Sequence, residues 1–132
     1  MESTSKPKSR KIKEPLAQYA VITRDMVKPA LIKERIPFDS RKITDFCQRW
    51  KVSEFSFFGS ILRDEFRPDS DVDVLVSFLP DAGWSLLDLI KMQSELEEMF
   101  KRKVDLVEKE ALRNPYRRHS ILSGRETIYA AR

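Results

Sequence analysis

The sequence predicts an α+β protein in which a small mixed β-sheet carries helices packed on one face. Short runs that alternate apolar and polar residues, or that are rich in valine and phenylalanine, occur three times, as expected for strands. Helical patterns with one apolar face precede the first run and separate the second from the third. The order of helix, strand, short helix, strand, helix, strand and helix is typical of one sheet covered by helices.

The composition is that of an ordinary globular domain. The 132 residues, of which 41% are hydrophobic and 35% are charged, suggest one domain. No apolar run approaches the ~20 residues of a membrane span, and residues 1–15 lack the apolar core of a secretory signal. The single cysteine, Cys47, cannot form an internal disulfide. We therefore expect a cytoplasmic protein that has no membrane partner.

Positive charge gathers at the beginning of the chain. Residues 1–36 contain nine Lys or Arg and four Asp or Glu, a net charge of +5, whereas residues 37–132 carry a net charge of −1. This contrast predicts a basic, partly flexible N-terminal extension over residues 1–36 and a folded domain over residues 37–132. Such a segment either binds nucleic acid or is a solvated arm, and we expect nucleic acid nowhere else. Residues 16–26 are compatible with a helix that Pro29 interrupts.

Local signals define the elements of the folded domain. Asp39 or Ser40 can cap a helix that starts near Arg41, and Cys47 on its apolar face is expected to be a small buried residue without a reactive role. Gly59 ends the first strand. Further elements are expected at residues 53–58 (strand), 60–66 (short helix), 71–78 (strand), 84–100 (helix), 103–109 (strand), 116–122 (short helix) and 127–129 (a last strand or a frayed end). The inner face of the long helix is predicted to contain Leu86, Leu89, Ile90, Gln93, Leu96 and Phe100.

Two aspartates stand at the start of the second predicted strand, where a buried strand should begin with apolar residues. Because strand side chains alternate, the valines of "DVDVLVSF" face one way, and Asp71 and Asp73 face the other, ~6–7 Å apart. Unpartnered carboxylates at this distance repel each other and raise each other's pKa. A divalent metal removes that cost, and Mg²⁺ prefers oxygen ligands from one or two carboxylates and from substrate phosphates.

A third carboxylate lies in the next predicted strand. In "KVDLVEK", Val104 and Leu106 face one way and Asp105 faces the other. If this strand lies beside the second, Asp105 joins Asp71 and Asp73 on an open face of the sheet. Three carboxylates there can hold two Mg²⁺ ions, which activate an attacking oxygen, orient phosphates and stabilise a leaving group.

A Gly-Ser pair precedes the aspartates by ten residues. Gly59 permits close backbone approach to a phosphate, and Ser60 adds a hydroxyl at the start of a short helix, whose N-terminus attracts anions. Arg63 can meet the same negative charge and is otherwise a surface ion-pair partner of a neighbouring acid. Ser70 either contacts a phosphate or caps its turn. We predict these four residues to bind the phosphates of a ligand such as a nucleotide, because the Gly-Ser pair, the two aspartates and Asp105 all fall on elements that can meet at one site.

The run "GSILRDEFRPDSDVDVLV" resembles the signature of the nucleotidyltransferases of the DNA polymerase β superfamily: Gly-Ser, ten residues, Asp-x-Asp and a third carboxylate on a later strand. The similarity extends from about residue 38 to about residue 130, and the short chain is similar to the minimal nucleotidyltransferases. It implies a polymerase-β-like fold and Mg²⁺-dependent transfer of a nucleoside monophosphate from an NTP, with release of pyrophosphate.

The resemblance also implies roles for the residues. Asp71, Asp73 and Asp105 would be the catalytic and metal-binding residues, with Asp105 also helping to activate the acceptor hydroxyl. Gly59 and Ser60 would hold the triphosphate. Many family members carry Arg-Gly where this chain has Arg63 followed by aspartate, a difference that leaves the carboxylates intact but affects the loop that meets the nucleotide.

Partners follow from the same resemblance. Minimal nucleotidyltransferases are frequently the antitoxins of two-gene toxin–antitoxin pairs with a HEPN-domain RNase, and they can transfer AMP from ATP to a tyrosine of that toxin. We therefore expect a protein adenylyltransferase that acts as a type VII-like antitoxin by AMPylation. ATP is the expected substrate and a cognate HEPN toxin the expected partner. One small domain has little surface to enclose an acceptor, which fits a macromolecular acceptor.

Two other functions remain open. The chain could neutralise its partner by binding alone, although a pure binder gains nothing from three clustered carboxylates. It could modify a small molecule such as an aminoglycoside, although such enzymes usually carry a further helical domain. His119, the only histidine, is expected to be a surface residue without a catalytic role. Arg117 and Arg118 are expected to be solvated or to contact an acidic partner.

Overall fold

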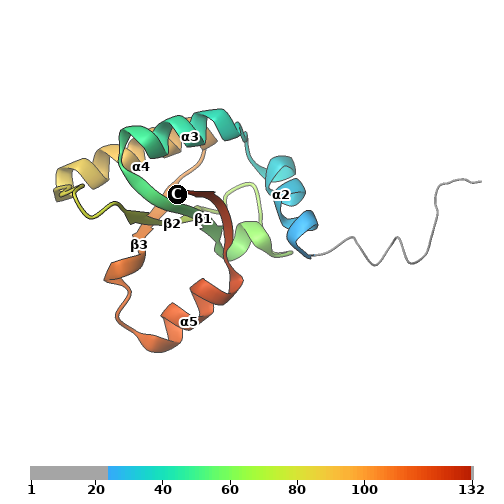
Figure 1. Ribbon diagram of the computed structural model, residues 1–132. Coiled ribbons are helices and arrows are strands. Elements are labelled where there is room, and N and C mark those ends of the chain that lie inside the picture. Colours follow the sequence, from blue (N-terminus) through green and yellow to red (C-terminus); the bar gives the residue numbers. More distant parts are fainter. Residues whose placement is uncertain (1–23, 132) are drawn as a thin grey trace, which may run out of the picture. The chain divides into compact units, whose positions relative to one another are not determined.

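A computed structural model describes the backbone of residues 24–131 and the side chains of residues 29–131 (Figure 1). Residue contacts divide the chain into two units, Met1–Ala30 and Leu31–Arg132, and the second unit contains the sheet. No helix of residues 24–131 is long and apolar enough to cross a membrane. The elements in chain order are α2 (Arg24–Arg35), α3 (Ser40–Arg49), β1 (Val52–Phe58), the 3₁₀ turn η1 (Gly59–Leu62), β2 (Val72–Phe78), α4 (Leu86–Phe100), β3 (Val104–Glu108), the 3₁₀ turn η2 (Lys109–Ala111), α5 (Pro115–Gly124) and β4 (Glu126–Ala130).

Within the described residues the strands form one mixed sheet in the order β3-β2-β1-β4. β1 pairs antiparallel with β2 on one side and with β4 on the other, while β2 pairs in parallel with β3. α4 forms the crossover between the two parallel strands, which a tight turn cannot join. The predicted α+β class and mixed sheet are confirmed, and residues 127–129 belong to an edge strand.

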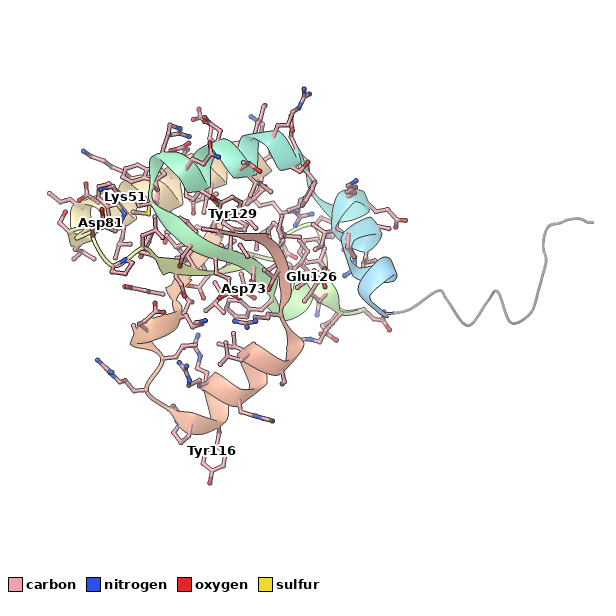
Figure 2. The ribbon with its side chains drawn as sticks, viewed as in Figure 1. Lys51, Asp73, Asp81, Tyr116, Glu126 and Tyr129 are labelled. Carbon is pink, nitrogen blue, oxygen red and sulfur yellow. The ribbon has the colours of Figure 1, made fainter. Side chains whose placement is uncertain are left out.

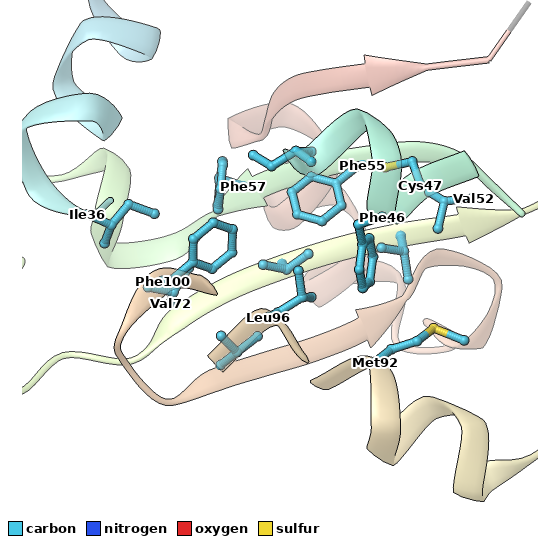
Figure 3. Packing of buried hydrophobic residues seen from close by; sticks show 14 of the residues in the cluster. Ile36, Phe46, Cys47, Val52, Phe55, Phe57, Val72, Met92, Leu96 and Phe100 are labelled. Carbon is cyan, nitrogen blue, oxygen red and sulfur yellow. The ribbon is translucent and has the colours of Figure 1, made fainter. Parts of the chain in front are cut away.

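The main hydrophobic core lies between the sheet and the helices α3 and α4 (Figures 1 and 3). The predicted apolar face of α3 is buried through Ile43, Phe46 and Cys47. The ring of Phe46 meets that of Phe55 on β1 edge to face, with 6.1 Å between centroids, and Phe57 continues this row of aromatic rings. Burial raises the pKa of the Cys47 thiol to about 12, which agrees with the predicted structural role.

The opposite face of the sheet is covered in part, by α5 and η2 (Figure 1). Phe58, Leu75, Leu112 and Ile121 form a second, smaller hydrophobic cluster there. This cover goes beyond the prediction, which placed helices on one face and expected α5 only as a short helix. Because the cluster occupies only part of the face, room remains beside it for polar side chains at the start of β2.

Polar contacts hold α5 against this face. Glu54 on β1 accepts a hydrogen bond from Lys109 Nζ at 2.9 Å, and its other oxygen lies 3.1 Å from Arg125 Nη1, just after α5. Arg118 donates to the Lys109 carbonyl at 3.1 Å. Both ends of α5 are therefore tied to the sheet through one partly buried glutamate and its lysine partner.

The prediction that Pro29 interrupts the first helix is wrong. α2 runs from Arg24 to Arg35 with Pro29 inside it, while the earlier residues of the predicted stretch lie outside the described part. Proline removes one helical hydrogen bond. Ile32 and Ile36, one turn apart, are buried in the core of the second unit, and this burial offsets the missing bond. That unit begins at Leu31, ahead of the predicted domain start at residue 37.

The predicted inner face of α4 is partly wrong. The buried residues are Met92, Leu96 and Phe100, which follow each other at intervals of four. Leu86 and Ile90 are 73% and 54% exposed, and Gln93 also faces solvent. At ~100° per residue, Ile90 lies about 160° round the helix from Met92 and cannot share its buried stripe. The prediction took the apolar residues of the helix as its inner face, but the sequence does not show which side of the helix the sheet covers.

The N-terminus of α3 gives the first testable prediction. Asp39 is the N-cap, and its side chain accepts a hydrogen bond from the Arg41 backbone N–H at 3.0 Å, as predicted. Replacing Asp39 with alanine leaves that donor without its partner, so we expect a loss of about 1 kcal/mol in the free energy of unfolding. Urea denaturation measures the loss. Asp39→Asn, which preserves the cap, should lie within a few tenths of a kcal/mol of the original protein, and an equal loss in both variants would contradict the capping role.

Candidate active site

The pairing of the two parallel strands brings two of the predicted carboxylates together. The register places Asp73 on β2 directly opposite Asp105 on β3, and Asp71 ends the loop just before β2. Val72 and Val74 are fully buried on the helix side, so Asp73 points to the other face, toward α5 (Figure 2). Asp73 is half-buried, whereas Asp71 and Asp105 are exposed. The predicted alternation of β2 and the predicted proximity of Asp105 are both realised.

Gly59 touches the carboxylate of Asp73. Gly59 has φ +79°, and a Cβ built on it would stand 2.0 Å from Asp73 Oδ2 and 3.0 Å from its Cγ. Real Cβ atoms are never found at such a distance from a side-chain oxygen, so only glycine lets the Asp73 side chain occupy this place. The Gly-Ser pair and the aspartates therefore meet in space, as two halves of one site.

The electrostatics of Asp73 follow from this crowding. Burial raises the pKa of Asp73 to about 6, and the negative charges of Asp105 and Asp71 add to the increase. Arg63 and Arg117 act in the opposite direction. A carboxylate held among other carboxylates is a costly arrangement unless a positive ion shares the site.

The connection between the two halves differs from the predicted helix over residues 60–66. η1 contains only Gly59–Leu62, and the chain is extended at Arg63. The Ser60 carbonyl accepts the Arg63 backbone N–H at 2.9 Å, and the carbonyls of Ser60 and Ile61 both accept hydrogen bonds from the Arg35 side chain. Runs of 3₁₀ helix are usually this short, because side chains three residues apart eclipse one another in them.

Two predicted nucleotide-binding residues have protein partners in this loop. The Ser70 hydroxyl accepts a hydrogen bond from the Arg67 backbone N–H at 2.9 Å, which is the turn-capping alternative. The Arg63 guanidinium pairs with Glu65 and is largely exposed. Contact of Ser70 or Arg63 with a nucleotide stays a prediction, as do the functional roles of Gly59, Ser60 and the three aspartates.

Sequence reasoning did not include Arg117 in the site. This residue lies in the first turn of α5, and its charge is close enough to Asp73 to lower the pKa of that carboxyl. The signal that could have found it is the segment of residues 111–125, which contains four arginines and no acidic residue. Only the packing of α5 against the sheet brings Arg117 of this segment near the carboxylates. His119, on the same helix, is exposed, as expected.

The donor set suits a divalent metal that substrate phosphates help to hold. The three aspartates offer only oxygen ligands, which Mg²⁺ prefers, and a cation among them would relieve the repulsion that raises the pKa of Asp73. Among the side chains of residues 29–131, no group of three or more His, Cys, Asp or Glu stands in an arrangement that could hold a metal ion by itself. One or two carboxylates together with phosphates is the usual way in which proteins bind Mg²⁺.

The raised pKa of Asp73 predicts how stability depends on pH in the absence of metal. Because the folded protein holds this proton more tightly than the unfolded chain, Asp73 favours folding below its usual pKa of 3.8, and that contribution is lost as the pH rises through about 6. With allowance for solvent at this half-buried group, we expect Asp73→Asn to be about 1–2 kcal/mol more stable than the original protein at pH 7. The difference should fall to near zero at about pH 4 in denaturant titrations without Mg²⁺. A difference that does not change with pH would contradict the assigned cause.

A carboxylate pair across two parallel strands, with Gly59 touching one of the two carboxylates, is the arrangement that the Gly-Ser and Asp-x-Asp signature predicts. The chain belongs to the nucleotidyltransferase domain family, whose model matches residues 39–128. The recognised signature of Gly59-Ser60 and Asp71-x-Asp73 lies inside the matched region.

Named relatives agree with this family. The chain is 42% identical over 69 residues to the protein adenylyltransferase MntA of Thermococcus cleftensis, a match that covers 51% of this chain and 66% of the relative. A solved structure provisionally described as a minimal nucleotidyltransferase is 32% identical, with a TM-score of 0.55, over 65% of this chain and 85% of that one.

A third similarity concerns the fold alone. The solved structure of a tri-AMPylated HEPN toxin of Shewanella oneidensis in complex with its MNT antitoxin contains a chain that is 16% identical to this one. The TM-score is 0.52, and the match covers 70% of each chain.

Proposed function

We propose that this nucleotidyltransferase transfers AMP from ATP to a hydroxyl, on a tyrosine of a partner HEPN toxin, in a Mg²⁺-dependent reaction that makes the chain an antitoxin. The observation that carries the proposal is the contact between Gly59 and the Asp73 carboxylate, since it joins the phosphate-binding turn to the carboxylate pair. The name of the Thermococcus cleftensis relative supports adenylyl transfer to protein, and the Shewanella oneidensis complex supports a HEPN toxin as acceptor.

Each residue has a distinct task in the proposed reaction. The backbone N–H groups of η1 and the Ser60 hydroxyl hold the β- and γ-phosphates of ATP. Asp71, Asp73 and Asp105 would hold Mg²⁺, which when bound neutralises phosphate charge and lowers the pKa of the attacking hydroxyl. Arg117 adds positive charge on the α5 side of the carboxylates, where the triphosphate would lie.

The bonds exchanged in the transfer balance as follows. The acceptor oxygen forms a bond to the α-phosphorus of ATP, and the bond from that phosphorus to the oxygen bridging to the β-phosphate breaks. Pyrophosphate leaves with the electron pair of the broken bond. The hydroxyl proton passes to Asp105, which is exposed and therefore accessible to an approaching acceptor, and from there to water.

Labelled ATP tests this function directly. The protein is incubated with Mg²⁺ and ATP labelled on the α-phosphate, with and without the protein encoded beside it, and the proteins are then separated and digested. Label is expected on a tyrosine of the partner, whereas ATP labelled on the γ-phosphate should leave none. The double variant Asp71→Asn with Asp73→Asn should transfer no label.

Two outcomes would replace the proposal. Full neutralisation of the partner by the double variant, without label transfer from the original protein, would mean that the chain acts by binding alone. Label transfer to an aminoglycoside and not to the partner would mean a small-molecule nucleotidyltransferase. Omission of Mg²⁺, by addition of EDTA, is expected to abolish label transfer, and transfer at an undiminished rate would exclude the metal requirement.

A further inference from the structure

The loop that joins the two halves of the site has little regular structure of its own. After η1 the chain is extended at Arg63, and a turn from Arg67 to Ser70 leads into β2. The site nevertheless requires Gly59-Ser60 and the aspartates to keep a fixed separation. Two arginine side chains from elsewhere in the chain bind the backbone of this loop.

Arg35, in the last turn of α2, holds the first part of the loop. Its Nη1 donates to the carbonyl oxygens of Ser60 at 3.3 Å and Ile61 at 3.1 Å, and also to that of Arg63. The Ser60 carbonyl also accepts the Arg63 backbone N–H at 2.9 Å, so the guanidinium adds to the hydrogen bond that closes η1. A single guanidinium therefore binds the turn that carries the Gly-Ser pair and the residue just after it.

Arg102, between α4 and β3, holds the second part of the loop. Its Nη1 donates to the carbonyl oxygens of Arg67 and Pro68, both at 2.8 Å, and of Ser70 at 3.1 Å. The next residue, Lys103, accepts a hydrogen bond from the Val72 N–H at 2.9 Å. The start of β2, which carries the aspartates, is thus fixed to the start of β3, which carries Asp105.

One aromatic ring connects the two arginines. The Cζ atom of Arg102 lies 4.4 Å from the centroid of the Phe66 ring, and that of Arg35 lies 5.4 Å from it. Both distances are within the ~6 Å at which a cation is attracted to a ring face. Phe66 is partly buried against the main core, so the pair of guanidinium groups is anchored to the body of the domain.

We propose that Arg35 and Arg102 are positioning residues with separate tasks: Arg35 sets the affinity for the nucleotide triphosphate, and Arg102 sets the affinity for Mg²⁺. Neither residue touches the carboxylates or belongs to the Gly-Ser signature. Arg35 acts through η1, while Arg102 acts through the loop end that delivers Asp71 and Asp73. This inference rests on the proposed use of the site for a nucleotide and a metal.

Binding of α,β-methylene-ATP to the full chain tests the division, because this analogue cannot undergo the transfer. Arg35→Gln is expected to raise the dissociation constant of the analogue, measured at saturating Mg²⁺, on the order of ten- to one-hundred-fold. The Mg²⁺ concentration that gives half-maximal binding of the analogue should change little. Arg102→Gln is expected to raise that Mg²⁺ concentration by a similar factor and to change nucleotide affinity at saturating Mg²⁺ much less. Arg35→Lys and Arg102→Lys, which keep a charged donor, should recover part of each loss.

Arg41→Gln is the matched control, because it also removes one positive charge, here from a side chain that is 93% exposed and lies 3.9 Å from Asp39. It should bind the analogue and Mg²⁺ as the original protein does. If Arg35→Gln and Arg102→Gln each weakened nucleotide binding and Mg²⁺ binding equally, in proportion to a lowered melting temperature, the division of tasks would be overturned. Unchanged affinities would overturn the positioning role altogether.

Hydrogen exchange of the loop decides the same question without a ligand. Arg35→Gln should speed exchange at the Arg63 amide, whose partner is the Ser60 carbonyl, and Arg102→Gln should speed exchange at the Ser70 amide, whose partner is the Arg67 carbonyl. Unaltered exchange in both variants would contradict the inference. Failure of the original protein to bind the analogue would contradict the proposed function, while the exchange rates would still test whether Arg35 and Arg102 hold the loop in place.

Discussion

Asp73→Asn is expected to reduce label transfer from ATP at least about a thousand-fold while leaving the protein folded. Asparagine keeps the shape of the side chain beside Gly59 but removes the charge that would share a metal with Asp105. Loss of metal-assisted charge stabilisation costs several kcal/mol in the transition state, and each 1.36 kcal/mol corresponds to about a factor of ten in rate. Single-turnover transfer at saturating ATP and Mg²⁺ measures the effect.

Asp69→Asn provides the control for this variant. Asp69 belongs to the same loop and is exposed, whereas the three atoms nearest to a Cβ at Gly59 all belong to Asp73. Its rate should lie within about two-fold of the original, since distant surface charges are screened. Retention by Asp73→Asn of more than a tenth of the original activity would show that Asp73 does not serve the chemistry.

Gly59→Ala is expected to lower activity nearly as far as the loss of Asp73 itself. The new Cβ would stand 2.0 Å from Asp73 Oδ2, so the carboxylate must move out of its place opposite Asp105. The positive φ of +79° adds a backbone cost of about 1–2 kcal/mol for a non-glycine residue. We therefore expect a lower melting temperature together with the loss of transfer.

Gly83→Ala separates these two effects. Gly83 also has a positive φ, +60°, but a Cβ there would meet nothing within 4 Å. It should show the backbone cost in stability without the loss of activity. A similar loss of activity in both glycine variants would assign the effect of Gly59→Ala to general destabilisation. Full activity of Gly59→Ala would show that the contact between Gly59 and Asp73 is not needed for the reaction.

Local sequence patterns were sufficient to predict the strands, the Asp39 cap and the placement of the carboxylates. Alternation along β2 forces Asp73 away from the buried valines, and this depends on strand geometry alone. The pairing of Asp73 with Asp105 required a further assumption, that the third strand lies beside the second, which the parallel register confirms. These features depend on period and spacing, which a sequence displays directly.

The features that were missed depend on which surfaces meet. Pro29 stays inside α2 although local rules end the helix there, since Ile32 is buried in the core. The exposed Leu86 and Ile90 show that apolar residues on a helix do not reveal which stripe is covered. Arg35 binds carbonyls about 25 residues away in the chain, and no local signal marks such a contact.

The register between β2 and β3 has a consequence for how this kind of enzyme can change over evolution. The relative placement of Asp73 and Asp105 is set by hydrogen bonds within the sheet, and surface segments that lie away from these two strands take no part in that pairing. Substitutions on those segments can therefore accumulate without disturbing the carboxylates. The enzyme could acquire a new acceptor through substitutions at its surface, while the catalytic carboxylates stay unchanged.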